Sequence, residues 1–439
     1  MPLPPITLAV RDVTLIDGIG GPPLDHANVL VSGERIVAAG PAAQTPVPEG
    51  TPLLEGAGKW LIPGLVDLHV HVNLCGLEAL PLWLRTGVTS VRDIGGSIES
   101  LIPARAELAA GTREGPRLFT HGPMIDGSPS GFGALPGGSF ERLWSEVDRP
   151  EAARAEADRL LAAGVDGLKL YQGLPLESVR ALLAHVGGRV PVTGHLTRTR
   201  ASDAVRAGIN CLEHNFVTPY NDVCRPEDRT AEGAGWHTPG FITRVHRGWA
   251  NADLNAPHVR EFIALLAESG VYYDPTLTWG TSALALEETE AEQGERHLTP
   301  TMQRRRELLA GRRAAALGAT ADSLRASAEK QLEFVSRLIE AGVLVMAGTD
   351  TGALEGIPGF TLHRELRYLV RCGMTPKLAL ERATRVAAEA LRRADDQGTV
   401  RPGQRADLVL LDADPLAEIR NTLRVSRVVK DGRVYEPLA

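Results

Sequence analysis

The chain has 439 residues, too many for one small domain and enough for a large barrel with a smaller attached domain. Lys and Arg number 47 and Asp and Glu 54, so the net charge is -7, which argues against nucleic acid and an anionic membrane as partners. Hydrophobic residues make up 43% of the sequence, which excludes general disorder. A globular protein with a full core is expected.

The cysteines and the start of the chain bear on its compartment. The four cysteines are Cys75, Cys211, Cys224 and Cys372. They are scattered along the chain without CxxC spacing, and we interpret them as reduced thiols. The first residues contain no basic segment followed by an apolar stretch, and no uncharged apolar run reaches the roughly 18 residues of a membrane span. We therefore expect a cytoplasmic protein.

Both ends of the chain have the pattern of short β-strands. Residues 6–16 and 29–39 are apolar and β-branched, and glycine-containing turns interrupt them. Residues 405–435 repeat this pattern at the other end. Because neither end alone has enough strands to close a core, we predict one small β-sandwich built from residues 1–60 and 396–439.

Between these ends, in residues 61–395, strand-like runs alternate with helical ones. Eight strands are predicted, at residues 65–71, 88–93, 116–120, 165–171, 190–195, 209–214, 271–273 and 343–350. This alternation predicts an α/β fold with parallel strands joined by helices, and eight repeats over this length favour a (β/α)₈ TIM barrel. The alternative is an open doubly wound sheet, but no glycine-rich dinucleotide motif follows the first strand.

Two long inserts interrupt the alternation, at about residues 216–256 and 278–320. The first contains aromatic and basic residues among Gly and Pro, and the second is acidic and then rich in Arg. They follow the sixth and seventh predicted strands and so leave the carboxyl ends of the strands, where loops of a barrel shape the active site. We expect both inserts to be lids that influence substrate choice.

The first predicted barrel strand ends in an HxH pair. His69 and His71 are two residues apart on a strand, so their side chains point to the same side, and imidazole is the commonest metal ligand. Taken alone, the pair is explained equally well as two buried, hydrogen-bonded histidines. Later strands end at His195, His214 and Asp350, and a parallel barrel brings such positions to one rim. Four imidazoles and a carboxylate there are typical ligands of zinc or a similar divalent ion.

Lys169 lies near the end of the fourth predicted strand, within an apolar run. A protonated ammonium group there would be costly without a partner, so an ion pair with a neighbouring carboxylate is the simpler explanation. A second explanation applies if two metal ions are present. A desolvated lysine with a lowered pKa can attack CO₂, and the resulting carbamate is an anionic bridging ligand.

Taken together and in this order, the motifs resemble those of the amidohydrolase superfamily. The similar segments are residues 63–71, 167–171, 195, 213–214 and 347–350. Residues 401–409 (RPGQRADLV) resemble the segment by which members return to the terminal β-sandwich, so the resemblance covers nearly the whole chain. The imidazolonepropionase and prolidase-like branch is the most similar.

The resemblance implies a metal-dependent hydrolase with two divalent metal ions, for which Zn²⁺ is the expected metal. His69 and His71 would bind the more buried ion, and His195 and His214 would bind the second. Lys169 would carry the CO₂-derived carbamate that bridges the two ions.

Asp350 would be both a ligand and the general base for a metal-bridging hydroxide, which can attack several kinds of bond. We favour an amide or peptide-like C–N bond in a small-molecule substrate, as in an N-acyl amino acid or a dipeptide. The alternatives are an esterase, lactonase or phosphotriesterase on the same site, an imidazolonepropionase-like cyclic amide hydrolase, and a non-catalytic scaffold. The complete ligand set argues against the scaffold. A homo-oligomer is expected.

One departure from the family pattern concerns substrate binding. Prolidase-type members often carry a GGH segment after the third strand, whose histidine contacts substrate, whereas residues 123–133 contain no histidine here. This weakens the expectation of dipeptidase activity. His121 and Tyr220 are candidates to replace that histidine, although either is explained equally well as a structural hydrogen-bonding residue. Trp236 and His237 are further candidate substrate-binding residues.

Overall fold

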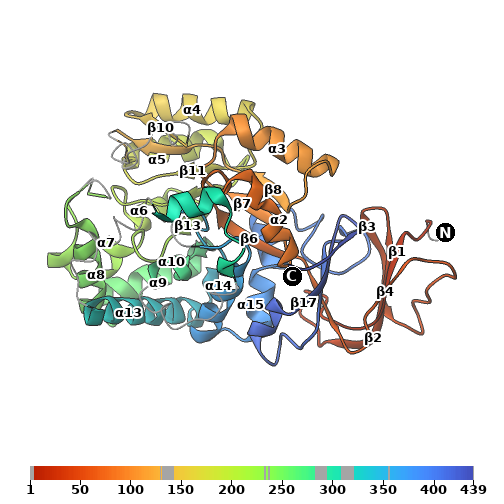
Figure 1. The fold of residues 1–439 in the computed structure, drawn as a ribbon. Helices are drawn as coiled ribbons and strands as arrows, with labels where there is room; N and C mark the ends of the chain where they lie inside the picture. The colour runs from red at the N-terminus through yellow and green to blue at the C-terminus, as the bar shows by residue number, and fades with distance from the viewer. Residues whose placement is uncertain are drawn as a thin grey trace.

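The computed structural model describes residues 4–128, 130, 143–231, 234–235, 238–281, 294–307, 321–353 and 356–438. Figure 1 shows a β-rich part formed by both ends of the chain, and a larger part in which strands and helices alternate. The predicted α/β class is confirmed.

The two ends of the chain share one mixed sheet, with the strand order β18-β17-β16-β5-β1-β2-β3 and β4 beside β1. Its strands are β1 (Leu8–Leu15), β2 (Leu24–Ser32), β3 (Arg35–Pro41), β4 (Leu53–Glu55), β5 (Trp60–Pro63), β16 (Leu408–Leu411), β17 (Val425–Lys430) and β18 (Arg433–Tyr435). The ends meet at β5, which pairs in parallel with β1 and antiparallel with β16. Apolar residues of both ends, such as Val10, Val29 and Leu410, pack into one buried cluster. Strands from the two ends therefore lie side by side in one sheet.

The other strands are parallel to their neighbours and form two sheets. The first has the order β6-β7-β8, with bounds Leu65–Val70, Val88–Asp93 and Arg117–Thr120. The second has the order β10-β9-β11-β12-β13-β14-β15, with bounds Trp144–Val147, Met124–Gly127, Leu168–Leu170, Val192–Gly194, Cys211–Glu213, Tyr272–Asp274 and Leu344–Val345. Eight of these strands coincide with the eight predicted ones. The strands β9 and β10 have no counterpart in the prediction, because Gly and Pro dominate the sequence around them.

Hydrogen bonds join the two parallel sheets to each other. Just before β11, the backbone N–H of Asp166 donates to Thr120 O at the end of β8 (2.7 Å). On the opposite side, Leu68 N of β6 donates to Ala347 O (3.2 Å), and a parallel bridge links Val70 to Thr351. The eight predicted strands are therefore linked in chain order, and the last is linked back to the first.

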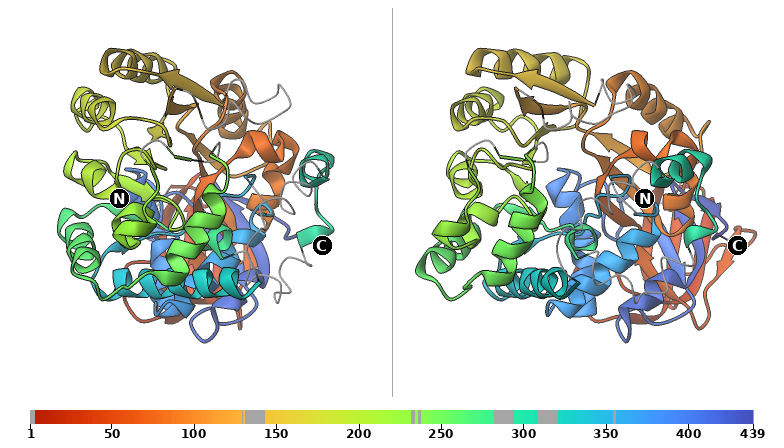
Figure 2. Two further views of the ribbon diagram at one scale, coloured as in Figure 1. Left: turned by 90° about the vertical axis from the view of Figure 1, so that its left-hand side faces the viewer. Right: turned by 60° about the vertical axis from the view of Figure 1, so that its left-hand side comes forward.

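Helices lie outside the parallel strands, as Figure 2 shows. They are α1 (Val72–Cys75), η1 (Leu77–Ala79), α2 (Leu80–Arg85), α3 (Ile98–Ala110), α4 (Pro150–Ala162), α5 (Leu176–Val186), α6 (Ala201–Arg206), α9 (Pro257–Ser269), α10 (Leu277–Gly280), α13 (Ala321–Glu340), α14 (Phe360–Arg371), α15 (Pro376–Arg382), α16 (Arg385–Ala390) and η4 (Ile419–Leu423). The helices α3 and α5 end at Gly111 and Gly187, whose left-handed backbone stops a helix at little steric cost. No helix in the described ranges is long and apolar enough to cross a membrane.

The first insert lies between β13 and β14 and contains α7 (Tyr220–Val223), η2 (Pro226–Asp228) and α8 (Phe241–Asn251). Two of its aromatic residues are hydrogen-bonded to backbone of the same insert. Trp249 Nε1 donates to Phe216 O (2.7 Å), and the Tyr220 hydroxyl donates to Asp228 O (2.7 Å). These hydrogen bonds stabilise the insert through contacts within its own residues. Trp236 and His237 lie outside the described residues.

The second insert is described at residues 278–281 and 294–307. Its segment 294–307 lies beside α1 and η1, where Thr299 Oγ1 donates to Cys75 O (3.3 Å) and Thr301 Oγ1 donates to Glu78 Oε1 (2.5 Å). Since α1 begins directly after His71, this segment of the insert is anchored next to the HxH strand.

A polar network joins the parallel strands to the terminal sheet. The guanidinium of Arg117 on β8 forms ion pairs with Asp407 and Asp431 and donates to Gln397 Oε1 (3.1 Å). Only 17% of the Arg117 side chain is exposed, so its charge depends on these carboxylates.

We expect Arg117→Gln to lower the free energy of unfolding by about 2 kcal/mol, between the roughly 1 kcal/mol of an exposed ion pair and the about 3–5 kcal/mol of a fully buried one. Urea unfolding followed by circular dichroism measures the change. The matched control is Arg11→Gln, because Arg11 pairs with Glu55 at an exposed site and its loss should cost less than about 1 kcal/mol. Equal losses in the two variants would contradict this role of the network.

Candidate active site

The carboxyl ends of the parallel strands bring the candidate ligands to one place. His69 lies on β6 and His71 directly after it, and His195, His214 and Asp350 follow β12, β13 and β15. All five residues are buried, with exposures of 6% or less. The structure therefore gathers histidines and a carboxylate from four strands that are far apart in the sequence.

Asp350 faces both histidines of the HxH pair. Its Oδ1 lies 3.0 Å from His71 Nε2 and 3.3 Å from His69 Nε2. Neither contact has the alignment of a hydrogen bond, so the three groups approach a shared volume without bonding to one another. Each of the three residues offers a ligand atom within 4.8 Å of the others, which makes them a candidate cation-binding group.

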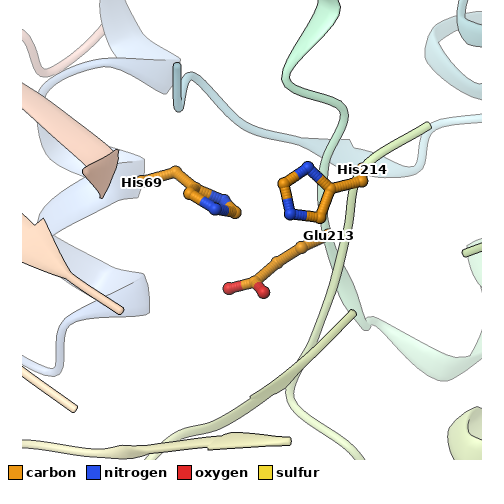
Figure 3. A group of neighbouring side chains, drawn as sticks. All are labelled: His69, Glu213 and His214. Atoms are coloured by element: carbon orange, nitrogen blue, oxygen red, sulfur yellow. The ribbon is translucent and has the colours of Figure 1, made fainter. Parts of the chain in front are cut away.

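A second candidate group combines His69 with Glu213 and His214. Figure 3 shows the two imidazoles facing each other across a gap, with the Glu213 carboxylate beside it. The ring centroids of His69 and His214 are 4.5 Å apart. His214 Nδ1 is hydrogen-bonded to Thr276 Oγ1 (2.9 Å), which leaves Nε2 as the ligand nitrogen.

His195 lies next to His214, with ring centroids 4.3 Å apart, and the Tyr171 ring is 4.8 Å from the His195 ring. Its Nε2 is 3.1 Å from the side-chain amide nitrogen of Gln172. Burial and nearby cationic groups lower the pKa of both His195 and His214 well below the usual range. Both imidazoles are therefore neutral, the form that binds a metal ion.

Lys169 is engaged by a carboxylate in this structure. Its Nζ forms an ion pair with Glu213 Oε2, and both side chains are buried. Arg92 Nη2 lies 3.7 Å from the other Glu213 carboxylate oxygen. Burial raises the pKa of Glu213, but attraction by Lys169 and by the other neighbouring cations lowers it to about 2. The ion pair is the simpler of the two explanations for a lysine in this strand.

Buried carboxyl groups outnumber the fixed cations at the site. Lys169 and Arg92 are accompanied by five such groups around the histidines, and burial raises the pKa of two of them, to about 7 and about 6; the five are Asp67, Asp93, Glu213, Asp274 and Asp350. Burial lowers the pKa of His69, yet the nearby carboxylates raise it to about 9. Within the described ranges, no hydrogen bond reaches either ring nitrogen of His69 or Oδ1 of Asp350. Unbonded ligand atoms in a volume that stabilises positive charge fit a divalent cation.

The backbone is strained at two of the candidate ligands. His214 has φ of +63° and Asp350 has φ of +58°, in the left-handed region that residues with a side chain rarely adopt. Such conformations cost free energy and cluster at functional sites. At Asp350 the bend lets the backbone N–H donate to His69 O (2.8 Å), which holds the carboxylate beside β6.

The candidate substrate-binding residues occupy different surroundings. His121 is buried, and a Cβ placed on Gly167 would lie 2.3 Å from its Nε2, so its ring packs against the backbone leading into β11. The Tyr220 hydroxyl is bonded to the backbone of the first insert. An aromatic residue without a predicted role, Trp279 on α10, borders the ligands, with its ring 5.4 Å from that of His214. The roles of His121 and Tyr220 stay predictions, as do those of Trp236 and His237.

Asp274 and the carboxylate of Glu213 are site groups without a sequence-based prediction. Asp274 is the last residue of β14, and its Oδ2 lies 3.4 Å from His69 Nδ1. The predicted seventh strand ends at Tyr273, one residue too early, so the strand-end rule that selected Asp350 would also have selected Asp274. For Glu213, the usable signal is a charged residue within an otherwise apolar strand.

Known proteins share this sequence pattern and this fold. Residues 60–435 match the sequence model of the amidohydrolase family. The imidazolonepropionase of Rubrobacter xylanophilus is 28% identical over 437 residues, a match that covers 94% of this chain and 91% of that protein. Among solved structures, an Xaa-Pro dipeptidase with bound methionine has a TM-score of 0.70 at 21% identity, covering 98% of this chain and 99% of that one. A prolidase complexed with N-methylphosphonate-L-proline has a TM-score of 0.70 at 22% identity, covering 98% and 100%. Because the family match spans most of the sequence, the chain belongs to the amidohydrolase family.

Proposed function

We propose that the protein is a metal-dependent hydrolase that cleaves an amide or peptide-like C–N bond in a small molecule. The observation that carries this proposal is the approach of His69 and His71 to Asp350, at 3.3 and 3.0 Å, without a hydrogen bond. Two imidazoles and a carboxylate are ligands that suit Zn²⁺. Membership of the amidohydrolase family supports hydrolysis as the reaction.

We also propose that residues 61–395 form a closed (β/α)₈ barrel that presents this site at the carboxyl ends of its strands. The hydrogen bonds from β6 to the chain beyond β15, and from the start of β11 to β8, support closure. In this proposal residues 1–60 and 396–439 form the β-sandwich. The inserts at about 216–256 and 278–320 are the lids.

The residues of the chain have separate tasks in this proposal. His69, His71 and Asp350 would hold one divalent ion, and His195 and His214 would hold a second. Bound ions would polarise the scissile carbonyl and lower the pKa of water toward neutrality.

The proton is handled by Asp350. Burial raises the pKa of this carboxyl group, but the histidines around it, among them the His69 imidazolium, hold it well below its usual range, so it is ionised. An ionised carboxylate beside the attacking water can accept its proton and return it to the leaving nitrogen.

We expect Asp350→Asn to reduce kcat by roughly 10²–10⁴-fold, the usual contribution of general acid–base catalysis, because the amide keeps the shape and removes the basicity. Steady-state kinetics on the best substrate measures this, and elemental analysis of the same sample shows whether metal is retained. Near-normal turnover with full metal content would mean that another residue transfers the proton.

We further propose that Lys169 is carboxylated when two ions are bound. Its neutral Nζ would form an N–C bond with CO₂ and lose one proton to water, which gives a carbamate anion. Two nearby cations would favour this exchange, because they repel the ammonium group and attract the carbamate. Lys169 would leave its ion pair with Glu213 in the process.

Lys169→Ala should lose activity and regain part of it when acetate or propionate is added, because a short carboxylic acid can take the place of the carbamate. The rescue is followed as rate against acid concentration. Amines of equal length are the control and should give no rescue. Full activity of Lys169→Ala without any addition would show that the lysine is not needed, and equal rescue by amines would favour the ion pair with Glu213 as its role.

The immediate surroundings of the ligands favour an apolar acyl group. The Trp279 ring lies 5.4 Å from that of His214 and 5.3 Å from that of Phe216, so aromatic surface borders the candidate ligands. Aromatic rings bury apolar groups effectively. We therefore propose an N-acyl amino acid with a hydrophobic acyl group, ahead of a dipeptide. The full-length similarity to an imidazolonepropionase supports a cyclic amide as a second candidate.

A substrate panel tests the bond type. Metal-loaded enzyme should show its highest kcat/KM with hydrophobic N-acyl amino acids, and a chelator should abolish the activity. The panel also contains dipeptides, a cyclic imidazolone, lactones, aryl esters and phosphotriesters. Trp279→Ala should raise KM for hydrophobic acyl groups while metal content stays unchanged. If esters or lactones exceed every amide by orders of magnitude, the C–N assignment is wrong.

A further inference from the structure

We propose that Asp274 is a positioning residue: its carboxylate faces Nδ1 of His69 at 3.4 Å, without a hydrogen bond in this structure, and once that imidazole is neutral it accepts the Nδ1–H and so directs Nε2 of the histidine toward the metal. The inference rests on the metal centre of the proposed function. It goes beyond that function because it assigns the task of orienting the first ligand to a carboxylate on the seventh strand.

The two ring nitrogens of His69 face different carboxylates. Nδ1 lies 3.4 Å from Asp274 Oδ2, and Nε2 lies 3.3 Å from Asp350 Oδ1. The second of these carboxylates also contacts His71, so the Nε2 side is where the ligand atoms gather. The side chains of His69 and Asp274 are fully buried, and water therefore does not compete for the Nδ1 proton. A neutral His69 with its proton on Nδ1 has its lone pair on Nε2.

Arg92 holds Asp274 in this place. Its Nη2 lies 3.6 Å from Asp274 Oδ2 and 3.7 Å from Glu213 Oε1. Its Nε donates to Leu68 O (2.6 Å), the backbone carbonyl next to His69. One buried guanidinium therefore connects strand β6, the carboxylate that faces Nδ1 and the carboxylate that binds Lys169. Arg92 does not pair with its neighbour Asp93, whose oxygens accept from Val72 N and Gly95 N.

The backbone leaves room for Asp274 at one glycine. A Cβ on Gly348 would lie 2.3 Å from Asp274 Oδ2 and 2.5 Å from Oδ1, far inside contact distance. Any larger residue at position 348 would therefore displace the carboxylate. This glycine immediately precedes Thr349 and Asp350. The same loop therefore supplies the candidate ligand Asp350 and the space that the Asp274 carboxylate occupies.

Asp274 differs from the candidate ligands in its surroundings. It lies on the Nδ1 side of His69, away from His71 and Asp350, and a fixed cation is beside it. A guanidinium at 3.6 Å would repel a metal ion bound to the same oxygen. A histidine ligand typically donates its other N–H to a carboxylate, and removing that partner costs 10–100-fold in metal affinity, as an order of magnitude.

Two variants test the proposal in the full-length protein. Asp274→Asn removes the charge and keeps the shape, and Gly348→Ala displaces the carboxylate while leaving it in the sequence. The controls are Asp222→Asn and Gly21→Ala. Asp222 is a buried carboxylate that pairs with Arg200 (2.8 Å) and accepts from Ser202 Oγ (2.7 Å), and a Cβ on Gly21 meets nothing within 4 Å.

The first readout is Zn²⁺ affinity, measured by competition with a chromophoric chelator. Both test variants should bind the ion roughly 10–100-fold more weakly than wild type, and both controls should bind it as wild type does. The second readout is the ¹⁵N NMR spectrum of metal-free protein labelled in histidine, recorded well above pH 9, because nearby carboxylates raise the pKa of His69 to about 9 and only the neutral imidazole has a tautomer. His69, assigned with a His69→Gln variant, should carry its proton on Nδ1 in wild type and lose that preference in Asp274→Asn.

Unchanged affinity and an unchanged tautomer in both test variants would overturn the inference. So would complete loss of the ion in Asp274→Asn, since that would make Asp274 a ligand. If the wild type itself binds no divalent ion, the proposed function fails first. The tautomer measurement on metal-free protein separates the two failures, because it does not need the ion.

Discussion

The arrangement of this site depends on buried carboxylates that outnumber the fixed cations beside them. Asp274, Glu213 and Asp350 come from three strands and surround His69, and Arg92 and Lys169 are the fixed cations beside them. Keeping such groups ionised away from water is costly unless positive charge is brought to them. The fold meets this cost with a guanidinium, an ammonium group and a proton on His69, whose pKa the carboxylates raise to about 9, and a bound divalent ion would take the place of that proton. The attraction for a cation is therefore a property of the folded strands before any ion arrives.

The strand-end rule explains why most of the site can be predicted from the sequence. A parallel arrangement places His69, His214 and Asp350 at one rim whatever the details of the helices, so their positions follow from alternation alone. Asp274 is missed because strand ends are uncertain by a residue or two and the predicted strand stops at Tyr273. The predicted strand is only one residue too short, but the omitted residue carries the carboxylate that faces His69.

Which charged groups pair with each other inside the site cannot be predicted from the sequence, for a different reason. Nothing local to Lys169 reveals that its carboxylate is Glu213, since the two meet only when β11 and β13 take their places around β12. The inserts show the same limit. Tyr220 and Trp249 have the composition of a binding surface, yet their polar atoms bond to backbone inside the insert. Whether an aromatic residue faces substrate or packs a lid depends on tertiary contacts that periodicity does not encode.

The terminal sheet has a consequence for how the chain is made. Leu61 on β5 pairs with Leu410 on β16, so during synthesis the first strands wait for nearly the entire polypeptide before their partner exists. Until then one edge of β5 is an unpaired, apolar template that can recruit another chain. Pairing between such distant segments is slow, and partly synthesised chains of this kind are exposed to aggregation. A nascent chain that stops short of β16 would leave this edge of β5 unpaired permanently. Pairing with β16 therefore protects the N-terminal strands from association with other chains.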